Sequence, residues 1–222
     1  MQVIQLGIPI ARCELIDAYT VRMVNVHSRL TLREQPMLLM EFHGSAADVA
    51  DQARSVQEVA AEHDGEAFAW ASTPEERTRL WTARHNAYFA AIHTHPGRRV
   101  ISTDTCVPIS RLADCLLAST AEAEATGLPH YVLGHVGDGN FHFGYLIDPD
   151  SASDWQVAER LNHALVQRAL AMGGTCSGEH GIGLHKMGFL REEAGEGAIA
   201  MMRAIKHALD PDGIMNPGKI FE

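Results

Sequence analysis

The sequence lacks several features, each of which would define a class of protein. It has no uninterrupted run of about 18 apolar residues, so no membrane-spanning helix is expected. Its first residues contain no basic segment followed by a long apolar run, so we expect no signal peptide. The net charge is −10, whereas a nucleic-acid partner requires a basic surface, so we expect no such partner.

Clustered cysteines and nucleotide-binding motifs are also missing. The four cysteines are widely separated and form no CxxC, which indicates reduced thiols and a cytoplasmic location. No GxGxxG follows a predicted strand and no Walker motif occurs, so the usual signatures of Rossmann and P-loop folds are lacking. Histidine, by contrast, is frequent, with 13 in 222 residues. This count directs attention to places where imidazoles can meet.

The hydrophobic patterns predict an α+β fold in one domain over residues 1–222, with helices packed on a mainly antiparallel sheet. Helix and strand patterns alternate, which suggests ferredoxin-like half-repeats. Ser45 and Thr73 are expected to begin helices as N-caps, the second followed by Pro74 and a capping-box Glu76. Helices are predicted over residues 11–27, 45–63, 73–93, 108–124, 152–172 and 195–209. Strands are predicted over residues 36–44 (buried), 66–72, 98–108, 130–136 and 141–147.

The stretch GHVGDGNFHF (134–143) is predicted to contain the turn of a β-hairpin. Its GDGN segment favours a turn, although histidines seven residues apart would also suit one face of a helix. With GDGN as the turn, Val136 would face Phe141 and His135 would lie opposite His142, their Cβ atoms about 4.5–5.5 Å apart. Gly144 would leave space beside His142 for a substrate or for backbone.

Two opposed imidazoles can share one metal ion, but an ordinary hairpin with two sheet histidines and a type I′ turn explains the same pattern. The glycine-rich stretch GTCSGEHGIG (174–183) offers a third ligand. His135, His142 and Glu179 would form a His₂Glu set with an open fourth position, as in catalytic metal sites. His180 is a candidate general base, and we expect its side chain to point away from Glu179 because neighbouring side chains diverge.

Three blocks resemble, in family order, the C-terminal domain of the FAD-linked oxidases: GHVGDGNFH, GEHGIGLHKMGFL and DPDGIMNPGKIF. MLLMEFHGS, LWTARHNAYFAA and STDTCVPIS resemble the D-lactate dehydrogenase (cytochrome) branch, which is related to the glycolate oxidase D subunit and D-2-hydroxyglutarate dehydrogenase. The resemblance covers nearly the whole chain. It implies the cap, or substrate, domain of a vanillyl-alcohol-oxidase-type flavoenzyme, lying over a flavin held by a separate N-terminal FAD-binding domain.

The resemblance also implies roles for individual residues. In this family a D-2-hydroxy acid such as D-lactate or glycolate is oxidised to the 2-oxo acid, with hydride passing to FAD. The family's metal ligands match His135, His142 and Glu179, and its catalytic base matches His180. Its substrate-carboxylate arginine matches Arg84. The ligand set suits a divalent metal, either zinc, manganese or iron.

Other positions bear on the cofactor and the substrate. The family resemblance implies that Asn216, with His180, lies near the flavin. Lys186 is expected at the surface or at a helix start. Members acting on longer diacids carry a lysine where this sequence has Ser102, which favours a small monocarboxylate substrate.

No segment of the chain matches the family's FAD-binding domain, so the chain is expected to be a domain fragment or a split gene product, inactive alone. Its partners would be the FAD-binding domain or subunit and the small 2-hydroxy acid, and an exposed cap surface could form a homodimer. A cytoplasmic location is expected, or attachment at the inner membrane through an electron-acceptor partner. Two alternatives are a free-standing His₂Glu metal-dependent hydrolase and a non-catalytic metal- or anion-binding module.

Overall fold

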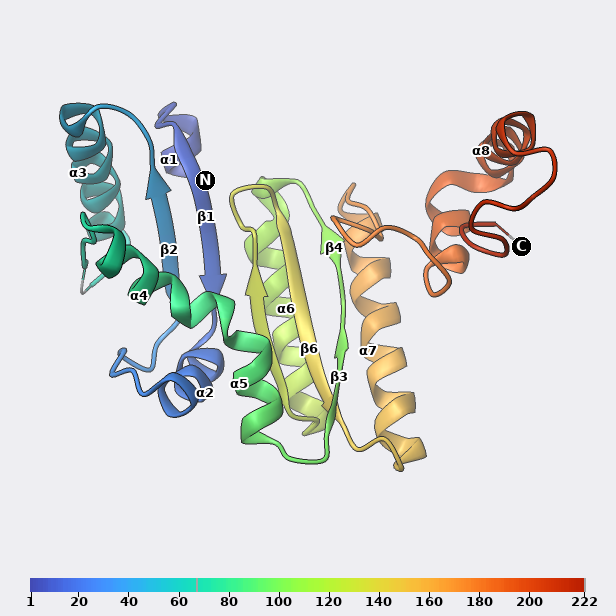
Figure 1. The fold of residues 1–222 in the computed structure, drawn as a ribbon, viewed down its shortest axis with the longest axis horizontal. Coiled ribbons are helices and arrows are strands. Elements are labelled where there is room, and N and C mark those ends of the chain that lie inside the picture. Colours follow the sequence, from blue (N-terminus) through green and yellow to red (C-terminus); the bar gives the residue numbers. More distant parts are fainter. Residues whose placement is uncertain (67, 222) are drawn as a thin grey trace.

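The computed structural model describes residues 1–66 and 68–221 (Figure 1). Its described strands form one six-stranded sheet in the order β2-β1-β5-β6-β3, with β4 also pairing on β6. Every pair of neighbouring strands is antiparallel, which confirms the predicted α+β class. The strands are β1 (Ile10–Ile16), β2 (Met37–Phe42), β3 (Arg99–Ser102), β4 (Thr105–Cys106), β5 (His130–Gly134) and β6 (Asn140–Ile147).

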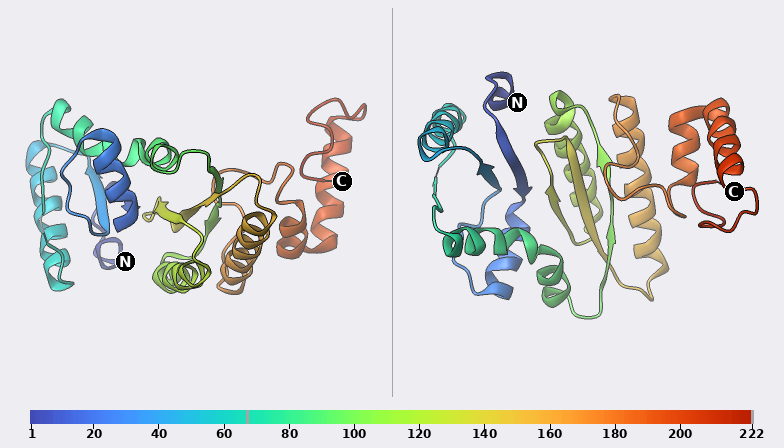
Figure 2. Two further views of the ribbon diagram at one scale, coloured as in Figure 1. Left: turned by 90° about the horizontal axis from the view of Figure 1, so that it is seen from below. Right: turned by 45° about the horizontal axis from the view of Figure 1, so that its top comes forward.

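Helices cover both faces of this sheet (Figure 2). On one face α2, α4 and α5 pack over a core that includes Ile16, Leu133 and Leu146. On the opposite face α6 and α7 pack over a core that includes Phe141 and Phe143. The helices are α1 (Gln2–Gln5), α2 (Ala18–Ser28), α3 (Ala46–Glu62), α4 (Pro74–His85), α5 (Ala87–Thr94), the 3₁₀ turn η1 (Ile109–Arg111), α6 (Leu112–Thr126), α7 (Ala152–Ala171) and α8 (Met187–Leu209). Within the described residues, none is long and apolar enough to cross a membrane.

The predicted helix over residues 11–27 was wrong in its first half, which forms β1. This strand pairs with β2 on one side and β5 on the other, and its buried residues, Glu14 and Ile16, alternate with the partly buried Cys13 and Leu15. The helix α2 begins only after Asp17, whose carboxylate accepts the backbone N–H of Thr20 at 2.7 Å as an N-cap. The predicted caps of α3 and α4, Ser45 and Thr73, are confirmed, each in a capping box.

Two predicted elements are each divided in the structure. The helix expected over 73–93 is interrupted at Asn86, whose side-chain amide donates to the Ser28 hydroxyl at 2.9 Å, and α5 then packs against α2. The strand expected over 98–108 breaks between β3 and β4, where the buried Thr103 and Asp104 leave the ladder. Both breaks bear on the candidate site because Arg84 and Asp104 lie beside them.

Two further predicted strands differ from the structure. Residues 66 and 68–72 are not a strand, and residue 67 lies outside the described residues. The strand over 36–44 exists as β2, but only Leu39 in it is buried, because β2 is at the edge of the sheet. The space expected beside Gly144 is filled: a Cβ there would stand 2.2 Å from the ring of Tyr131, its cross-strand partner.

A candidate metal and substrate site

The hairpin of β5 and β6 brings His135 and His142 to the same side of the sheet. Leu133, rather than His135, lies opposite His142, so the predicted register was wrong by two residues. A shift of two residues keeps every side chain on its original face, because side chains alternate with a period of two. His135 therefore still projects toward His142, and their ring centroids are 5.7 Å apart.

The connection of the hairpin runs over residues 135–139, because β5 already ends at Gly134 and β6 begins at Asn140. The side-chain amide of Asn140 donates to the Asp104 carboxylate and to the Thr105 carbonyl, both at 2.9 Å. The preceding Gly139 has a φ of 82°, and a Cβ there would stand 2.1 Å from the Val107 carbonyl oxygen. Only glycine fits this place. The GDGN segment therefore forms the turn and also allows the chain after β4 to lie close to it.

Glu179 completes a three-residue cluster, as predicted. Its Oε1 lies 3.2 Å from Nε2 of His135 and 3.1 Å from Nε2 of His142. The three donor atoms all lie within 4.8 Å of one another. Glu179 comes from the loop after α7, more than thirty residues along the chain from the hairpin. The fold therefore brings together the side chains that the sequence singled out.

The hydrogen-bond partners of the two imidazoles determine which nitrogens carry lone pairs. Nδ1 of His142 lies 2.9 Å from the Thr103 carbonyl oxygen, so it carries the proton and Nε2 has the lone pair. Burial lowers the pKa of His142, although its bond to Thr103 opposes the shift, and the neutral ring is favoured. Nδ1 of His135 lies 2.7 Å from a Glu14 oxygen, which gives His135 the same tautomer. Two lone pairs thus converge on the Glu179 carboxylate, an arrangement that suits a bound cation.

Arg84 lies at the same cluster, at the C-terminal end of α4. Its Nε donates to Oε2 of Glu14 at 2.9 Å, and its Nη2 lies 3.5 Å from Nε2 of His135. The side chain is 17% exposed, so it is neither free in solvent nor enclosed. A guanidinium has five N–H donors, and those not used here remain able to bind a carboxylate.

His180 does not point away from Glu179, and this expectation was wrong. Its ring stacks on His142 at a centroid distance of 4.9 Å and an interplanar angle of 8°, and its Nε2 lies 3.7 Å from Oε1 of Glu179. Neighbouring side chains diverge along a strand, but residues 177–180 form an irregular loop in which this rule does not hold. The candidate base therefore belongs to the same cluster as the candidate ligands.

The loop that carries Glu179 and His180 is held by Asp104, which is fully buried. The carboxylate of Asp104 accepts the backbone N–H of Glu179 at 3.0 Å and of His180 at 2.9 Å, the amide of Asn140, and the ammonium of Lys186 at 2.8 Å. Burial opposes ionisation, but the bonds from Lys186, His180, Asn140 and Glu179 outweigh it and hold the pKa of Asp104 far below its usual range.

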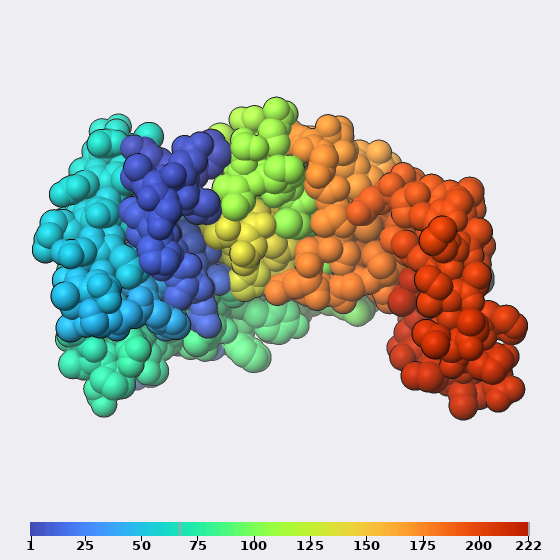
Figure 3. All heavy atoms as spheres, turned by 90° about the horizontal axis from the view of Figure 1, so that it is seen from above, coloured from blue at the N-terminus to red at the C-terminus, as the bar shows by residue number. Residues whose placement is uncertain are grey.

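Asn216 is not joined to this cluster. It lies in the tail after α8 with a φ of 46°, and no hydrogen bond given for the described residues ties it to the hairpin or to the 177–180 loop. The tail is held by Asp210, which accepts the backbone N–H groups of Ile214 and Met215, and by the backbone N–H of Ile220, which donates to the Gly183 carbonyl at 2.9 Å. The C-terminal helix and tail stand out at one end of the molecule (Figure 3).

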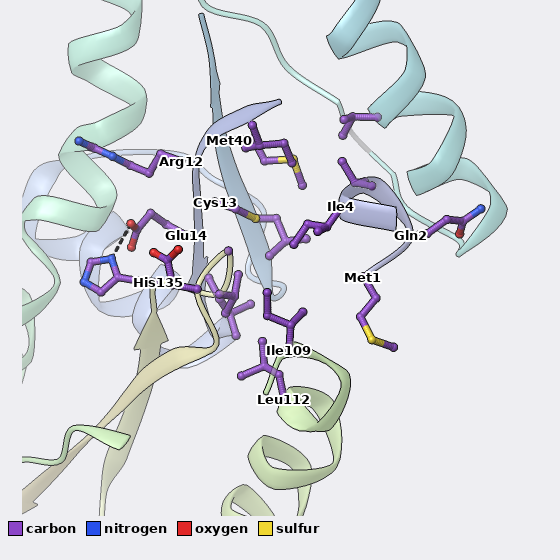
Figure 4. Close-up of a pocket in the computed structure, with 18 of the residues that line it drawn as sticks. Met1, Gln2, Ile4, Arg12, Cys13, Glu14, Met40, Ile109, Leu112 and His135 are labelled. Carbon is purple, nitrogen blue, oxygen red and sulfur yellow. Dashed lines mark hydrogen bonds and ion pairs between the residues drawn. The ribbon is translucent and has the colours of Figure 1, made fainter. Parts of the chain in front are cut away.

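A cavity of about 1510 Å³ lies between α1, β1, α3 and the start of α6 (Figure 4). Its lining is largely apolar and includes Ile4, Cys13 and Met40. Burial, with the nearby Glu14 charge, raises the pKa of the Cys13 thiol to about 11, so this thiol stays uncharged at neutral pH. Glu14 and His135 border the cavity, which places the candidate site at its edge.

Three residues of the site were not predicted from the sequence. Glu14 was assigned to a helix, and Asp104 to an uninterrupted strand. Lys186 was expected at the surface or a helix start; it is the N-cap of α8, but its ammonium is bonded to Asp104. A signal was present for Glu14, since a lone carboxylate alternates with Cys13 and Leu15 in a strand-like pattern. The partners of Asp104 are distant in sequence and left no local signal.

The fold and the cluster define a class of protein: an α+β domain whose antiparallel sheet carries a His₂Glu group beside a partly buried arginine. Family comparison gives the same result, since residues 1–220 match the model of the FAD linked oxidases, C-terminal domain. The chain belongs to this family.

Several curated relatives are similar to this chain over nearly its whole length. The chain is 43% identical over 222 residues to the probable mitochondrial D-lactate dehydrogenase of Danio rerio, covering all of this chain and 45% of the relative. It is 43% identical over 215 residues to a mitochondrial D-lactate dehydrogenase [cytochrome] of Arabidopsis thaliana, covering 97% and 38%. Identity to the glycolate oxidase subunit GlcD of Escherichia coli (strain K12) is 28%, covering 93% and 41%. The chain thus spans less than half the length of these relatives.

A solved structure shares the fold. The 4-ethylphenol oxidase of Gulosibacter chungangensis superposes with a TM-score of 0.70 at 13% identity, over 95% of this chain and 47% of that one. This likeness confirms the predicted fold, a mainly antiparallel sheet with helices packed on it.

Proposed function

We propose that the chain is the substrate- and metal-binding domain of a flavin-dependent D-2-hydroxy acid dehydrogenase that oxidises D-lactate or glycolate to the 2-oxo acid. The observation that carries this proposal is the convergence of His135, His142 and Glu179, with two Nε2 lone pairs 3.1–3.2 Å from one carboxylate oxygen and Arg84 beside them. A bound metal can lower the pKa of the hydroxyl of a 2-hydroxy acid, and an arginine can bind its carboxylate.

In this proposal His135, His142 and Glu179 hold one divalent cation and leave a position open for the substrate. Zinc, manganese and iron all accept these donors. When bound, such a cation supplies a Lewis acid that lowers the pKa of a substrate hydroxyl. The protein fixes the ligands in advance, because Thr103 holds the His142 ring and the backbone of Glu179 is bound by Asp104.

Two further side chains act on the substrate in this proposal. Arg84 binds the substrate carboxylate through the N–H groups that Glu14 leaves free. His180 accepts the hydroxyl proton, and its ring, stacked on His142 and 47% exposed, can still reach a substrate molecule. The backbone N–H of His180 donates to Asp104, which fixes where the base stands.

We propose that FAD, which accepts the hydride when bound, is held mainly by an FAD-binding domain or subunit, with Asn216 and His180 as contacts from this chain. Residues 1–220 match the family's C-terminal domain, and no GxGxxG segment follows a strand in the described residues. The isolated chain is therefore expected to be inactive. Homodimer formation, and a cytoplasmic site or attachment to the inner membrane through an electron acceptor, remain predictions.

The position of Ser102 supports a small monocarboxylate as substrate. Ser102 ends β3 opposite Gly144, which puts it on the face of the sheet that carries His142. A lysine at this position would bring a second cation toward the cluster, whereas serine does not. The single arginine of the cluster, Arg84, then matches a substrate with one carboxylate.

The proposal predicts that the purified chain has no flavin absorbance and does not oxidise D-lactate, but does so when the FAD-binding half is added. Dye reduction by D-lactate measures this complementation. Arg84→Ala is expected to abolish it, whereas Arg79→Ala, an exposed arginine on the same helix, is expected to leave it intact. Tight flavin binding by the chain alone would contradict the proposal that a separate domain or subunit holds FAD. Ester or amide hydrolysis without flavin would favour a hydrolase. If neither D-lactate oxidation nor hydrolysis is found, a non-catalytic module is favoured.

A further inference from the structure

Glu14 occupies the position opposite His135 across the β1–β5 pair. Leu15 lies opposite Gly134 and Ile16 opposite Leu133, and the same register continued by one residue sets Glu14 against His135. Opposed residues in an antiparallel pair project to the same face. The side chains accordingly meet, with Oε1 of Glu14 2.7 Å from Nδ1 of His135 (Figure 4).

The other oxygen of the same carboxylate is bonded to Arg84. Its Oε2 accepts the Arg84 Nε–H at 2.9 Å, and Glu14 is only 4% exposed. A buried carboxylate is costly unless it is paired, and here each oxygen has one donor, one of them charged. Glu14 thus connects the ring of a candidate metal ligand with the guanidinium of the candidate substrate arginine.

We propose that Glu14 is a positioning residue that sets both halves of the site, an inference that rests on the proposed function. By accepting the Nδ1–H of His135, it fixes the tautomer in which Nε2 has a lone pair for the metal. By accepting the Nε–H of Arg84, it orients the guanidinium so that the remaining N–H groups bind a carboxylate. Glu14 does not touch the substrate or the metal in this account.

The change Glu14→Gln separates these functions from simple packing, because glutamine has nearly the same shape. An amide offers one acceptor oxygen and one NH₂ donor group in place of two acceptor oxygens. His135 and Arg84 both donate to Glu14, so one of them must face the NH₂ group of the glutamine. A guanidinium cannot accept a hydrogen bond, so the amide oxygen faces Arg84 and the NH₂ group faces His135. Nδ1 of His135 then becomes the acceptor and Nε2 carries the proton, which removes the lone pair needed by the metal.

The experiment measures zinc and manganese affinity of the purified chain by competition with a chromophoric chelator. Glu14→Gln is expected to weaken binding by about 10–100-fold, the usual effect of losing an outer partner of a metal-bound histidine. Glu41→Gln is the matched control: Glu41 is on the neighbouring strand β2 and pairs with Arg12 in register. Within the described residues its carboxylate bonds only to His43. The control variant is expected to bind metal as the unchanged chain does.

A second measurement uses the unchanged chain and does not depend on a variant that folds. At pH 8.5, where imidazole is ordinarily neutral, nitrogen NMR of the metal-free chain reports the tautomer of each ring. The His135 signals, assigned by their loss in His135→Gln, are expected to show the proton on Nδ1, and Glu14→Gln is expected to move it toward Nε2.

The outcomes distinguish this inference from the proposed function. If the unchanged chain binds no divalent metal, the proposed metal site fails, and the inference that depends on it fails too. If the chain binds metal but Glu14→Gln binds it equally well, or if His135 carries its proton on Nε2 in the unchanged chain, Glu14 has no positioning role while the metal site stands.

Discussion

Replacing both His135 and His142 by alanine is expected to abolish tight binding of a divalent metal by this chain. The unchanged protein should contain about one zinc or manganese ion per chain, and the double variant none. Two of three donors are then lost, so the affinity should fall by more than the roughly 10–100-fold that follows removal of an outer partner. Elemental analysis and chelator competition measure the metal content and the affinity.

The chain provides a matched control for this variant. His27 and His93 form a second pair of neighbouring imidazoles, with ring centroids 5.3 Å apart, on α2 and α5. Within the described residues, neither histidine belongs to a group of three donors close enough to hold a metal ion. His27→Ala with His93→Ala should leave the metal content unchanged. If this control loses the metal and the His135–His142 variant keeps it, the assignment of the site is wrong.

Replacing Asp104 by asparagine is expected to lower the free energy of unfolding by about 3–5 kcal/mol, the usual cost of breaking a buried ion pair. Asp104 is fully buried and its partner Lys186 is 17% exposed, so little solvent screening offsets the loss. An asparagine has one neutral acceptor oxygen in place of two charged ones. It cannot replace the bonds that Asp104 accepts from Lys186 and from the backbone N–H groups of Glu179 and His180. The variant should therefore loosen the loop as well as destabilise the domain.

Urea-induced unfolding measures the lost free energy of unfolding. Metal affinity reports whether the loop still positions Glu179. Asp51→Asn is the control, because Asp51 pairs with Arg54 at the surface, where both side chains are more than 60% exposed. Such a pair contributes about 0–1 kcal/mol. Equal stability losses in the two variants would show that Asp104 is not the anchor described above, as would a destabilised Asp104 variant that binds metal with unchanged affinity.

The sequence predicted those parts of the site that local chemistry determines. The turn residues between Val136 and Phe141 specify a hairpin, and alternation along its strands then decides which face His135 and His142 share. An error of two residues in the register did not affect this result. Glu179 was found because a carboxylate between glycines in a loop is a recognisable ligand, and the family blocks support the same set.

The sequence could not predict contacts that depend on how distant elements pack. The stretch that contains Glu14 has apolar spacings that fit a helix, and it becomes a strand only because β2 and β5 pair with it on both sides. Asp104 looks like a strand residue until the loop after α7 is folded onto it. The direction of the His180 side chain depended on that loop as well. Each of these errors concerns a contact between segments far apart in the chain.

The most direct test of the central claim, that His135, His142 and Glu179 bind a divalent metal, is anomalous X-ray diffraction from crystals of the chain grown with zinc. We predict one strong anomalous peak about 2.0–2.1 Å from Nε2 of both histidines and in bonding distance of the Glu179 carboxylate. The absence of a peak there would contradict the claim. So would a peak among Asp104, His142 and His180, the other group of donors in the described residues that lies close enough to hold a metal.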